Sequence, residues 1–318
     1  MIRRLEPNES RSFSALANEC GYIFATPAWL ESVKPSLFGI FDKNSRMIGG
    51  FVAAESRIGR WSILRTPRYY PTVGPFFLCE ASNPAKLVEA RRRIFWEIMN
   101  FIDNLGPVAL SLSLDRQHTD VLPFIWRGCK ATPGYTYTLN LEKGEERLLS
   151  AMSPKRRSEL RKSEKDGVIV EETRDLDCVE RIVSLTFSRQ HKRYPAKLLH
   201  ELLSRLAGET SWYAVLARVN NSVASVAFCQ YSQSTSYYLF GGYDASLRSA
   251  QAGSATLWKT IQIAIEKGLT SFDFEGSMNP AIERFYSDFG GDLQHYFRIS
   301  RAWWLIECGL KLKWRDCF

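Results

Sequence analysis

Apolar and polar positions alternate along this chain with two different periods. Between Pro84 and Leu105 apolar residues recur every three or four positions, which predicts one long amphipathic helix. A second helical pattern, rich in Leu, covers residues 197–206. A period near two predicts strands instead, most clearly the three strands of a meander at 212–219, 225–231 and 237–243. The mixture of both periods predicts an α+β fold.

Two domains are expected because 318 residues exceed the size of one typical domain. Strands and helices occur in both halves, and a new strand pattern begins shortly after Ala131. We therefore predict an N-terminal domain over residues 1–131 and a C-terminal domain over residues 132–318.

Composition and charge limit the possible classes of function. Hydrophobic residues make up 45% of the sequence, enough for large cores, and the net charge is +8. A basic surface favours anionic partners such as nucleic acid, nucleotide-bearing cofactors or a membrane face. The seven cysteines are scattered without a CxxC pair, so no metal site is predicted. The polar N-terminus and the lack of a long apolar run predict a cytoplasmic protein without a membrane-spanning helix.

Residues 251–291 hold the richest pattern of candidate chemistry. A small-residue segment precedes an amphipathic helical pattern that ends at Gly268, and a short apolar strand pattern follows at 271–274. Small residues at the start of a helix let its backbone N–H groups approach a phosphate closely. Arg248, Gln251, Ala252, Gly253 and Ser254 belong to this segment.

A second pattern follows the short strand. Asn279 precedes Tyr286 by seven residues, and Gly290 lies four residues further on. Together with the small-residue segment, these spacings resemble the GNAT acyltransferase superfamily. In that family the loop holds the pyrophosphate of coenzyme A, although the family has a Gly where Gln251 stands. The resemblance implies an acyl-CoA co-substrate, with acetyl-CoA as the leading choice, and a cofactor contact from Asn279.

The same resemblance implies two catalytic devices. Tyr286 is expected to protonate the departing thiolate, because a neutral phenol near the sulfur can donate a proton. Gly241 and Gly242 are expected to permit a β-bulge, which would free a backbone N–H to hold the acyl oxygen of the substrate. A core-packed tyrosine and an ordinary glycine-containing strand end are the plain alternatives.

Further segments narrow the resemblance to the FemABX-like branch, with BioF2-like acetyltransferase-domain proteins as its kin. The matching segments, which span about residues 20–300, are Phe24–Trp29, Tyr137–Leu141, Ser153–Arg157, Phe272–Ser277 and Phe285–Gly291. The branch implies two tandem GNAT-like domains, each with a mixed, mostly antiparallel twisted sheet flanked by helices. The first domain would serve the acceptor and the second the acyl donor.

The same family resemblance implies which residues contact the acceptor and which residue acts as a base. The expected acceptor contacts, besides the two glycines above, are Lys34, Tyr69, Tyr70, Arg157 and Arg161. The basic run from Lys155 to Lys165 also fits a solvated helix face with i,i+3 or i,i+4 ion pairs. Asp273 and Glu275 alternate along a strand pattern, so they share a face, and Glu275 is the leading choice of base.

Three functions remain open at this point. The leading hypothesis is an N-acyltransferase that moves an acyl group from acyl-CoA to a primary amine of an amino sugar or cell-envelope precursor. The second is aminoacyl transfer from aminoacyl-tRNA to a peptidoglycan precursor. Enzymes of that kind commonly carry a Lys where this chain has Tyr286, which favours the first hypothesis. The third is a non-catalytic module that binds nucleic acid or anionic lipid.

The tail of the chain adds one further alternative. From Arg301 onward it has three Trp among basic residues. This composition fits either a final packed helix or a peripheral contact with a membrane surface, where Trp and Lys are both favoured.

Overall fold

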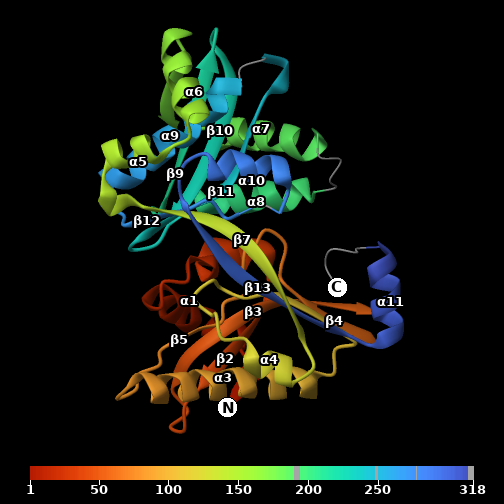
Figure 1. Ribbon diagram of the computed structural model, residues 1–318. Helices are drawn as coiled ribbons and strands as arrows, with labels where there is room; N and C mark the ends of the chain where they lie inside the picture. The colour runs from red at the N-terminus through yellow and green to blue at the C-terminus, as the bar shows by residue number, and fades with distance from the viewer. Residues whose placement is uncertain (190–193, 248–249, 277, 314–318) are drawn as a thin grey trace. The chain divides into compact units, whose positions relative to one another are not determined.

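A computed structural model describes the chain except for residues 190–193, 248–249, 277 and 314–318 (Figure 1). The chain forms two compact units, one made of Met1–Gly134 with His295–Phe318 and the other of Tyr135–Gln294.

The first unit contains the beginning and the end of the chain. Its elements are β1 (Ile2–Arg4), α1 (Ser10–Glu19), α2 (Pro27–Val33), β2 (Ser36–Phe41), β3 (Met47–Ile58), β4 (Trp61–Arg65), β5 (Phe76–Phe77), α3 (Pro84–Leu105), β6 (Ala109–Ser113), α4 (Leu122–Trp126), and α11 (Trp304–Lys313). The strands β7 (Lys130–Asn140) and β13 (Asp292–Ala302) each run from one unit into the other.

The second unit contains the remaining elements. They are α5 (Glu145–Ala151), α6 (Pro154–Lys165), β8 (Ile169–Thr173), α7 (Leu176–Arg189), α8 (Ala196–Leu206), β9 (Trp212–Val219), β10 (Ser222–Tyr231), β11 (Thr235–Tyr243), α9 (Ala250–Glu266), β12 (Ser271–Asp273) and α10 (Pro280–Ser287).

The sheets of the two units follow one scheme. In the first unit β1, β2, β3 and β4 pair antiparallel in that order, β6 lies parallel beside β4, and β13 lies antiparallel beside β6. In the second unit β8, β9, β10 and β11 pair antiparallel, β12 lies parallel beside β11, and β7 lies antiparallel beside β12. In each unit a single long helix connects the two parallel strands, α3 in the first and α9 in the second. The predicted α+β fold is confirmed.

The division of the chain differs in detail from the boundary expected from the sequence. The first unit ends at Gly134 rather than Ala131, and it also takes residues 295–318 from the end of the chain. The reason is the register of β13, whose residues Arg298 to Ala302 pair with β6. Strand pairing between segments so distant in sequence has no local signal.

Local sequence explains where the long helices begin and end. Asn83 caps α3 through its side chain, which accepts a hydrogen bond from the N–H of Lys86 at 3.0 Å, and Gly106 ends it in a left-handed conformation. Among the residues that the structure describes, no helix combines the length and the apolar character needed to cross a membrane.

The core of the second unit surrounds α9 and the centre of the sheet. Its fully buried residues include Tyr213, Val215, Leu257, Ile261, Phe272 and Phe289. The removal of apolar side-chain surface from water is the main favourable contribution to folding. It fixes α9 against the strands, and so determines where the start of that helix lies.

Candidate functional site

The two parallel strands of the second unit separate soon after they meet. β11 and β12 pair over three positions, and the last pair joins Tyr237 to Asp273. The next residue, Phe274, donates its N–H to the carbonyl of Tyr137 at 3.1 Å, so the chain follows β7 and leaves β11. From Tyr238 onward, no strand of the described residues lies beside the edge of β11 that faced β12. An open strand edge of this kind can hydrogen-bond an extended ligand.

A β-bulge lies at the point of separation. Phe228 of β10 pairs with Phe240, whereas the next residue, Cys229, pairs with Tyr238. Leu239 is therefore the extra residue of the bulge, and its backbone groups leave the regular ladder. The bulge had been expected at Gly241 and Gly242.

The two glycines serve packing instead of the bulge. Both pair regularly with β10. A Cβ at Gly241 would lie 1.8 Å from the hydroxyl oxygen of Tyr238, and a Cβ at Gly242 would lie 2.0 Å from Oγ1 of Thr186 on α7. A side chain at either position would therefore require the neighbouring side chain to shift.

Tyr286 lies against the residues that flank the separation of the strands. Its ring centroid is 6.1 Å from that of Tyr238 on β11 and 5.2 Å from that of Phe274, which follows β12. Burial raises the pKa of Tyr286, so the phenol stays protonated through the physiological range. No hydrogen bond joins its hydroxyl to any residue that the structure describes. Among the described residues the hydroxyl is thus a proton donor without a hydrogen-bond partner.

The spacing of Asn279, Tyr286 and Gly290 has a structural explanation. The side chain of Asn279 accepts a hydrogen bond from the N–H of Ala281 at 3.0 Å and so caps α10, the helix that carries Tyr286. Gly290 ends this segment with φ of 77°, and a Cβ there would lie 2.4 Å from the carbonyl oxygen of Ala151. The two residues fix the helix at both ends. Asn279 had been expected to contact the cofactor.

At the start of α9 some residues are packed against the sheet, and others leave space for a ligand. Arg248 lies outside the described residues. Ala252 is fully buried against Ala217 and Ala224, whereas Gln251 is half-buried. A Cβ at Gly253 would meet no atom closer than 4.0 Å, so packing does not require glycine there. The first N–H groups of the helix have no partner within it, which suits an anion.

Ser254, expected to bind phosphate, belongs to a buried network. Its hydroxyl donates a hydrogen bond to Glu159 at 2.6 Å and accepts one from Arg156. Ser254 has no exposed surface, so its hydroxyl is not available to a ligand.

Arg156 is the centre of that network, and sequence reasoning had grouped it with the solvent-exposed basic residues of α6. Its side chain is 2% exposed, forms ion pairs with Glu159 and Asp288, and donates to the carbonyl of Phe285 at 3.0 Å. The guanidinium lies 4.1 Å from the ring centroid of Phe285 and 4.8 Å from that of Phe289. Arg156 therefore joins the start of α9 to the helix of Tyr286.

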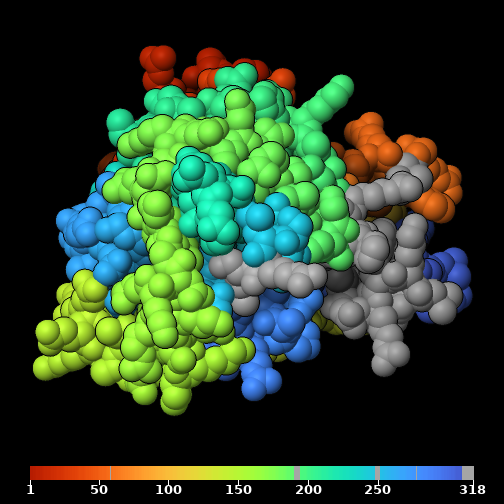
Figure 2. Space-filling view, turned by 90° about the horizontal axis from the view of Figure 1, so that it is seen from above, coloured from red at the N-terminus to blue at the C-terminus, as the bar shows by residue number. Residues whose placement is uncertain are grey.

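The other two arginines of interest on α6 have different surroundings. Arg157 donates to the carbonyls of Ser150 and Met152 at 2.7 and 3.0 Å, which satisfies the end of α5. Arg161 is exposed. Figure 2 shows α6, in yellow-green, on the surface of the second unit. Of the two, Arg161 is available to a partner in solution.

The two candidate bases do not share a strand face. Asp273 is 3% exposed and accepts hydrogen bonds from Oγ1 of Thr136 at 2.7 Å and from the N–H of Glu275 at 2.9 Å. Glu275 has φ of 54°, which ends the strand alternation after Asp273. The carboxylate of Asp273 stabilises this turn, and Glu275 is the more accessible of the two.

The expected acceptor residues of the first unit are Lys34, which follows α2, and Tyr69 and Tyr70, which lie in the loop after β4. Lys34 ends α2 with φ of 50°, and Tyr69 has φ of 66° in the loop after β4. Tyr70 is buried, with its ring centroid 4.9 Å from that of Trp29, and its hydroxyl has no hydrogen-bond partner among the residues that the structure describes. Left-handed backbones at non-glycine residues are uncommon and often accompany function.

Comparison with known proteins agrees with this geometry. Residues 154–295 match the family model described as an acetyltransferase (GNAT) domain, Acetyltransf_6. The predicted GNAT-type N-acyltransferase class is confirmed. No curated protein matches the sequence.

Solved structures extend the likeness over nearly the whole chain. FemX is 14% identical over 93% of this chain and 96% of its own, with a TM-score of 0.67. The C-terminal domain of a putative lysylphosphatidylglycerol synthetase from Agrobacterium fabrum is 11% identical over 95% and 97%, with a TM-score of 0.59. A tandem GNAT protein from the clavulanic acid biosynthesis pathway is 8% identical over 95% and 98%, with a TM-score of 0.53. At such identities the likeness establishes the fold, and the predicted FemABX-like tandem GNAT fold is confirmed.

Proposed function

We propose that this GNAT protein transfers an acyl group from a coenzyme A thioester to a primary amine of an amino sugar or cell-envelope precursor. The observation that carries the proposal is the separation of β11 from β12 with Tyr286 packed against both flanks. The open edge of β11 and the start of α9 suit an extended donor with a phosphate at one end. The phenol of Tyr286, which has no hydrogen-bond partner among the described residues, suits the thioester at the other end.

The donor is proposed to bind along β11 and at the start of α9. The pyrophosphate would lie at the free N–H groups of residues 250–253, where the helix dipole favours negative charge. Gly253 leaves space there, and Gln251 offers a side-chain amide. Ala252 and Ser254 would contribute backbone N–H groups only. Arg248 stays a proposal from the sequence.

The reaction is proposed to be a direct attack of the amine on the thioester carbonyl. The backbone N–H freed by the bulge at Leu239 would hold the oxygen as it gains negative charge. Tyr286 would give its proton to the sulfur as the carbon–sulfur bond breaks, which releases coenzyme A as the thiol. Glu275 remains the proposed acceptor of the proton that the amine loses.

The acceptor is proposed to contact Lys34, Tyr69 and Arg161. Their cationic and phenolic groups suit a phosphorylated or nucleotide-linked sugar. Tyr70 and Arg157 are less suited than expected, because the first is buried and the second holds the end of α5.

A Tyr286→Phe variant tests the chemistry. We expect kcat for acetyl-CoA-dependent thiol release with a panel of amines to fall by about 10²–10⁴-fold, because a general acid contributes that much. Binding of acetyl-CoA should be unchanged. In the wild type, no loss of kcat from ionisation of Tyr286 should appear below pH 10, since burial raises its pKa. An unchanged kcat in the variant would remove Tyr286 from the mechanism.

Aminoacyl transfer from tRNA is the second candidate, because FemX matches 93% of the chain in fold. It would require aminoacyl-tRNA binding that weakens steeply with salt. Measuring binding of aminoacyl-tRNA and of acetyl-CoA to the same preparation over a range of salt separates the two donors.

A further inference from the structure

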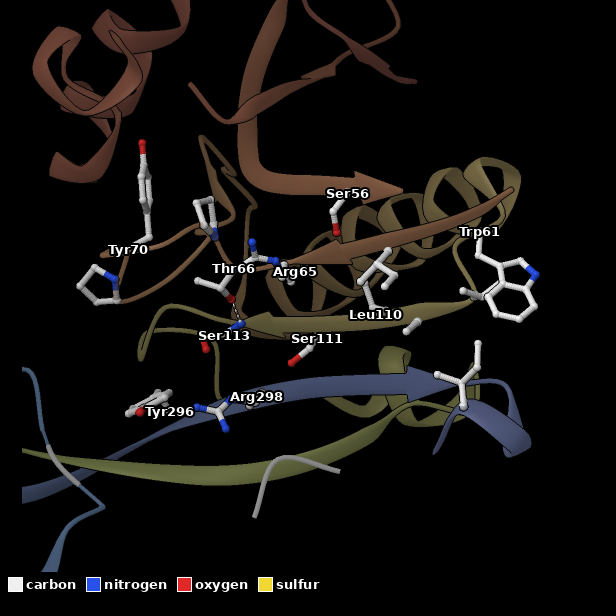
Figure 3. Close-up of a pocket in the computed structure, with 16 residues that line it drawn as sticks. Ser56, Trp61, Arg65, Thr66, Tyr70, Leu110, Ser111, Ser113, Tyr296 and Arg298 are labelled. Atoms are coloured by element: carbon white, nitrogen blue, oxygen red, sulfur yellow. Dashed lines mark hydrogen bonds between the residues drawn. The ribbon is translucent and has the colours of Figure 1, made fainter. Parts of the chain in front are cut away.

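The first unit contains a groove that includes none of the proposed acyl-donor residues of the second unit. Its volume is about 690 Å³, within the range of small-molecule sites. It opens over β4, β6 and β13, and Figure 3 shows the side chains that line it. All of the residues that line it belong to the first unit.

Strand register places two arginines on the same side of the sheet. Arg65 of β4 pairs with Ser111 of β6, and Arg298 of β13 pairs with Ser113 of β6. Directly paired residues, and residues two apart on one strand, point to the same face. The two cationic side chains therefore flank a pair of hydroxyl groups within the groove (Figure 3).

The charge of the groove is one-sided. None of its sixteen lining residues is Asp or Glu. Arg65 is half-buried, and no carboxylate of the described residues forms an ion pair with it. Burial, and then the nearby charge of Arg68, lower the pKa of Arg65, so both disfavour its positive charge in the described part of the chain.

A second observation indicates a missing polar partner. Ser300 pairs with Ser111, so it lies on the same face of the sheet, and it is 1% exposed. Its hydroxyl oxygen is buried and has no hydrogen-bond partner within the described part of the chain. A buried hydroxyl without a partner is destabilising, and such groups are uncommon in folded proteins.

The remainder of the groove and its rim are apolar. Ile63, Val108 and Ile306 line it, and Trp61 lines it while remaining 40% exposed. Next to Ile306 the chain exposes three large apolar side chains: Trp303 at 60%, Trp304 at 73% and Leu305 at 63%. Exposed apolar residues that gather in this way mark a surface that contacts an apolar partner.

We propose that this groove binds an amphiphilic anion, with a carboxylate or phosphate head between Arg65 and Arg298 and an alkyl body along Trp61, Ile63 and Ile306. The head supplies the negative charge that the lining lacks, and the alkyl body covers the apolar wall. This site does not depend on the proposed acyl transfer.

Calorimetry on the full-length protein tests the site. The probes are decanoate and decyl phosphate, with decyl maltoside as the neutral control, all below their micelle concentrations. We expect both anions to bind at least about tenfold tighter than the maltoside, because a hydrogen bond to a charged group contributes roughly that factor. Equal affinity for the neutral and anionic probes would overturn the proposal.

Two variants and one control locate the binding. Arg65→Gln removes the charge, and Ser111→Asp places a carboxylate opposite Arg65. Each should weaken anion binding by about tenfold, and the second still tests the site if the first fails to fold. Arg57→Gln makes the same charge change at an exposed position of β3 and should bind as the wild type does. Wild-type affinity in the folded groove variants would overturn the proposal.

Vesicles distinguish the source of the amphiphile. Phosphatidylcholine vesicles with and without phosphatidylglycerol are sedimented with the wild type and with Ser111→Asp. Binding to the anionic vesicles that is lost in the variant identifies a bilayer lipid. Binding confined to the monomeric probes identifies a free amphiphile.

Discussion

Replacing Arg156 with Met should strongly destabilise the second unit. The guanidinium is nearly inaccessible to water and joins three segments: α6, the start of α9 through Ser254, and α10 through the carbonyl of Phe285. Methionine keeps the apolar stem and removes the charge. Glu159 and Asp288 would then lose their shared cationic partner.

The expected size follows from the exposure of those two carboxylates. Removing one partner of a buried ion pair costs about 3–5 kcal/mol when the remaining charge is fully buried. Glu159 and Asp288 keep 20% and 19% of their side-chain surface exposed, so water can solvate them in part. We therefore expect a loss near the lower limit, about 3 kcal/mol. For a domain of this size that corresponds to a fall in Tm of about 6–12 °C.

The assay is thermal and urea unfolding of the full-length protein, and Arg161→Met is the matched control. Arg161 lies on the same helix but is exposed, so its replacement should change the free energy of unfolding by no more than about 0.5 kcal/mol. If Arg156→Met lost less than about 1 kcal/mol, or no more than the control, the network would not join the three segments as described.

Two further substitutions test packing and electrostatics. Gly242→Ala would place a Cβ 2.0 Å from Oγ1 of Thr186 and should lower the free energy of unfolding in urea by about 1–3 kcal/mol. Gly253→Ala would place a Cβ no closer than 4.0 Å to any neighbouring atom, so it should be neutral or stabilising. Equal effects of the two substitutions would contradict the packing account. The Glu180 carboxylate, 2.8 Å from Nδ1 of His200, raises the pKa of that imidazole, so the pair stabilises the fold below about pH 6.5 and the contribution disappears as pH rises through the raised pKa. Glu180→Gln should lower the pKa of His200 toward its ordinary value in an NMR titration, and an unchanged midpoint would show that the pair does not form in solution.

Features with local signals could be predicted from the sequence. The helix over 84–105 has the predicted bounds because Pro84 opens it and Gly106, the next residue after it, ends it. The order of helix, short strand and second helix around Tyr286 was also predicted, because each element has its own periodicity and stop. These signals require no knowledge of the rest of the fold.

Features that depend on distant pairing could not be predicted. The bulge lies at Leu239 because of its register against Phe228 and Cys229 of β10, which no glycine reveals. Arg156 was assigned to an exposed basic face because the aromatic rings that cover it, Phe285 and Phe289, come about 130 residues later.

The relative positions of Asp273 and Glu275, at the end of β12, could not be predicted from the sequence either. Alternation from Asp273 to Glu275 assumes that the strand continues, but Glu275 has a left-handed backbone and its N–H binds Asp273. The turn is stabilised by Thr136, which lies far away in sequence. Periodicity therefore predicted the strand and could not predict its last residue.

The central claim is that acyl-CoA binds at the start of α9, and the most direct test is calorimetric titration of acetyl-CoA into the wild type and Gln251→Glu. The added carboxylate should stabilise the helix start, by about 0.3–1 kcal/mol, while it repels the pyrophosphate. Gln233→Glu makes the same charge change at an exposed turn of the second unit and is the control. Micromolar binding by the wild type and the control, weakened about tenfold or more in Gln251→Glu, is the predicted result. Equal affinity in all three proteins, or no binding to the wild type at millimolar acetyl-CoA, would contradict the account.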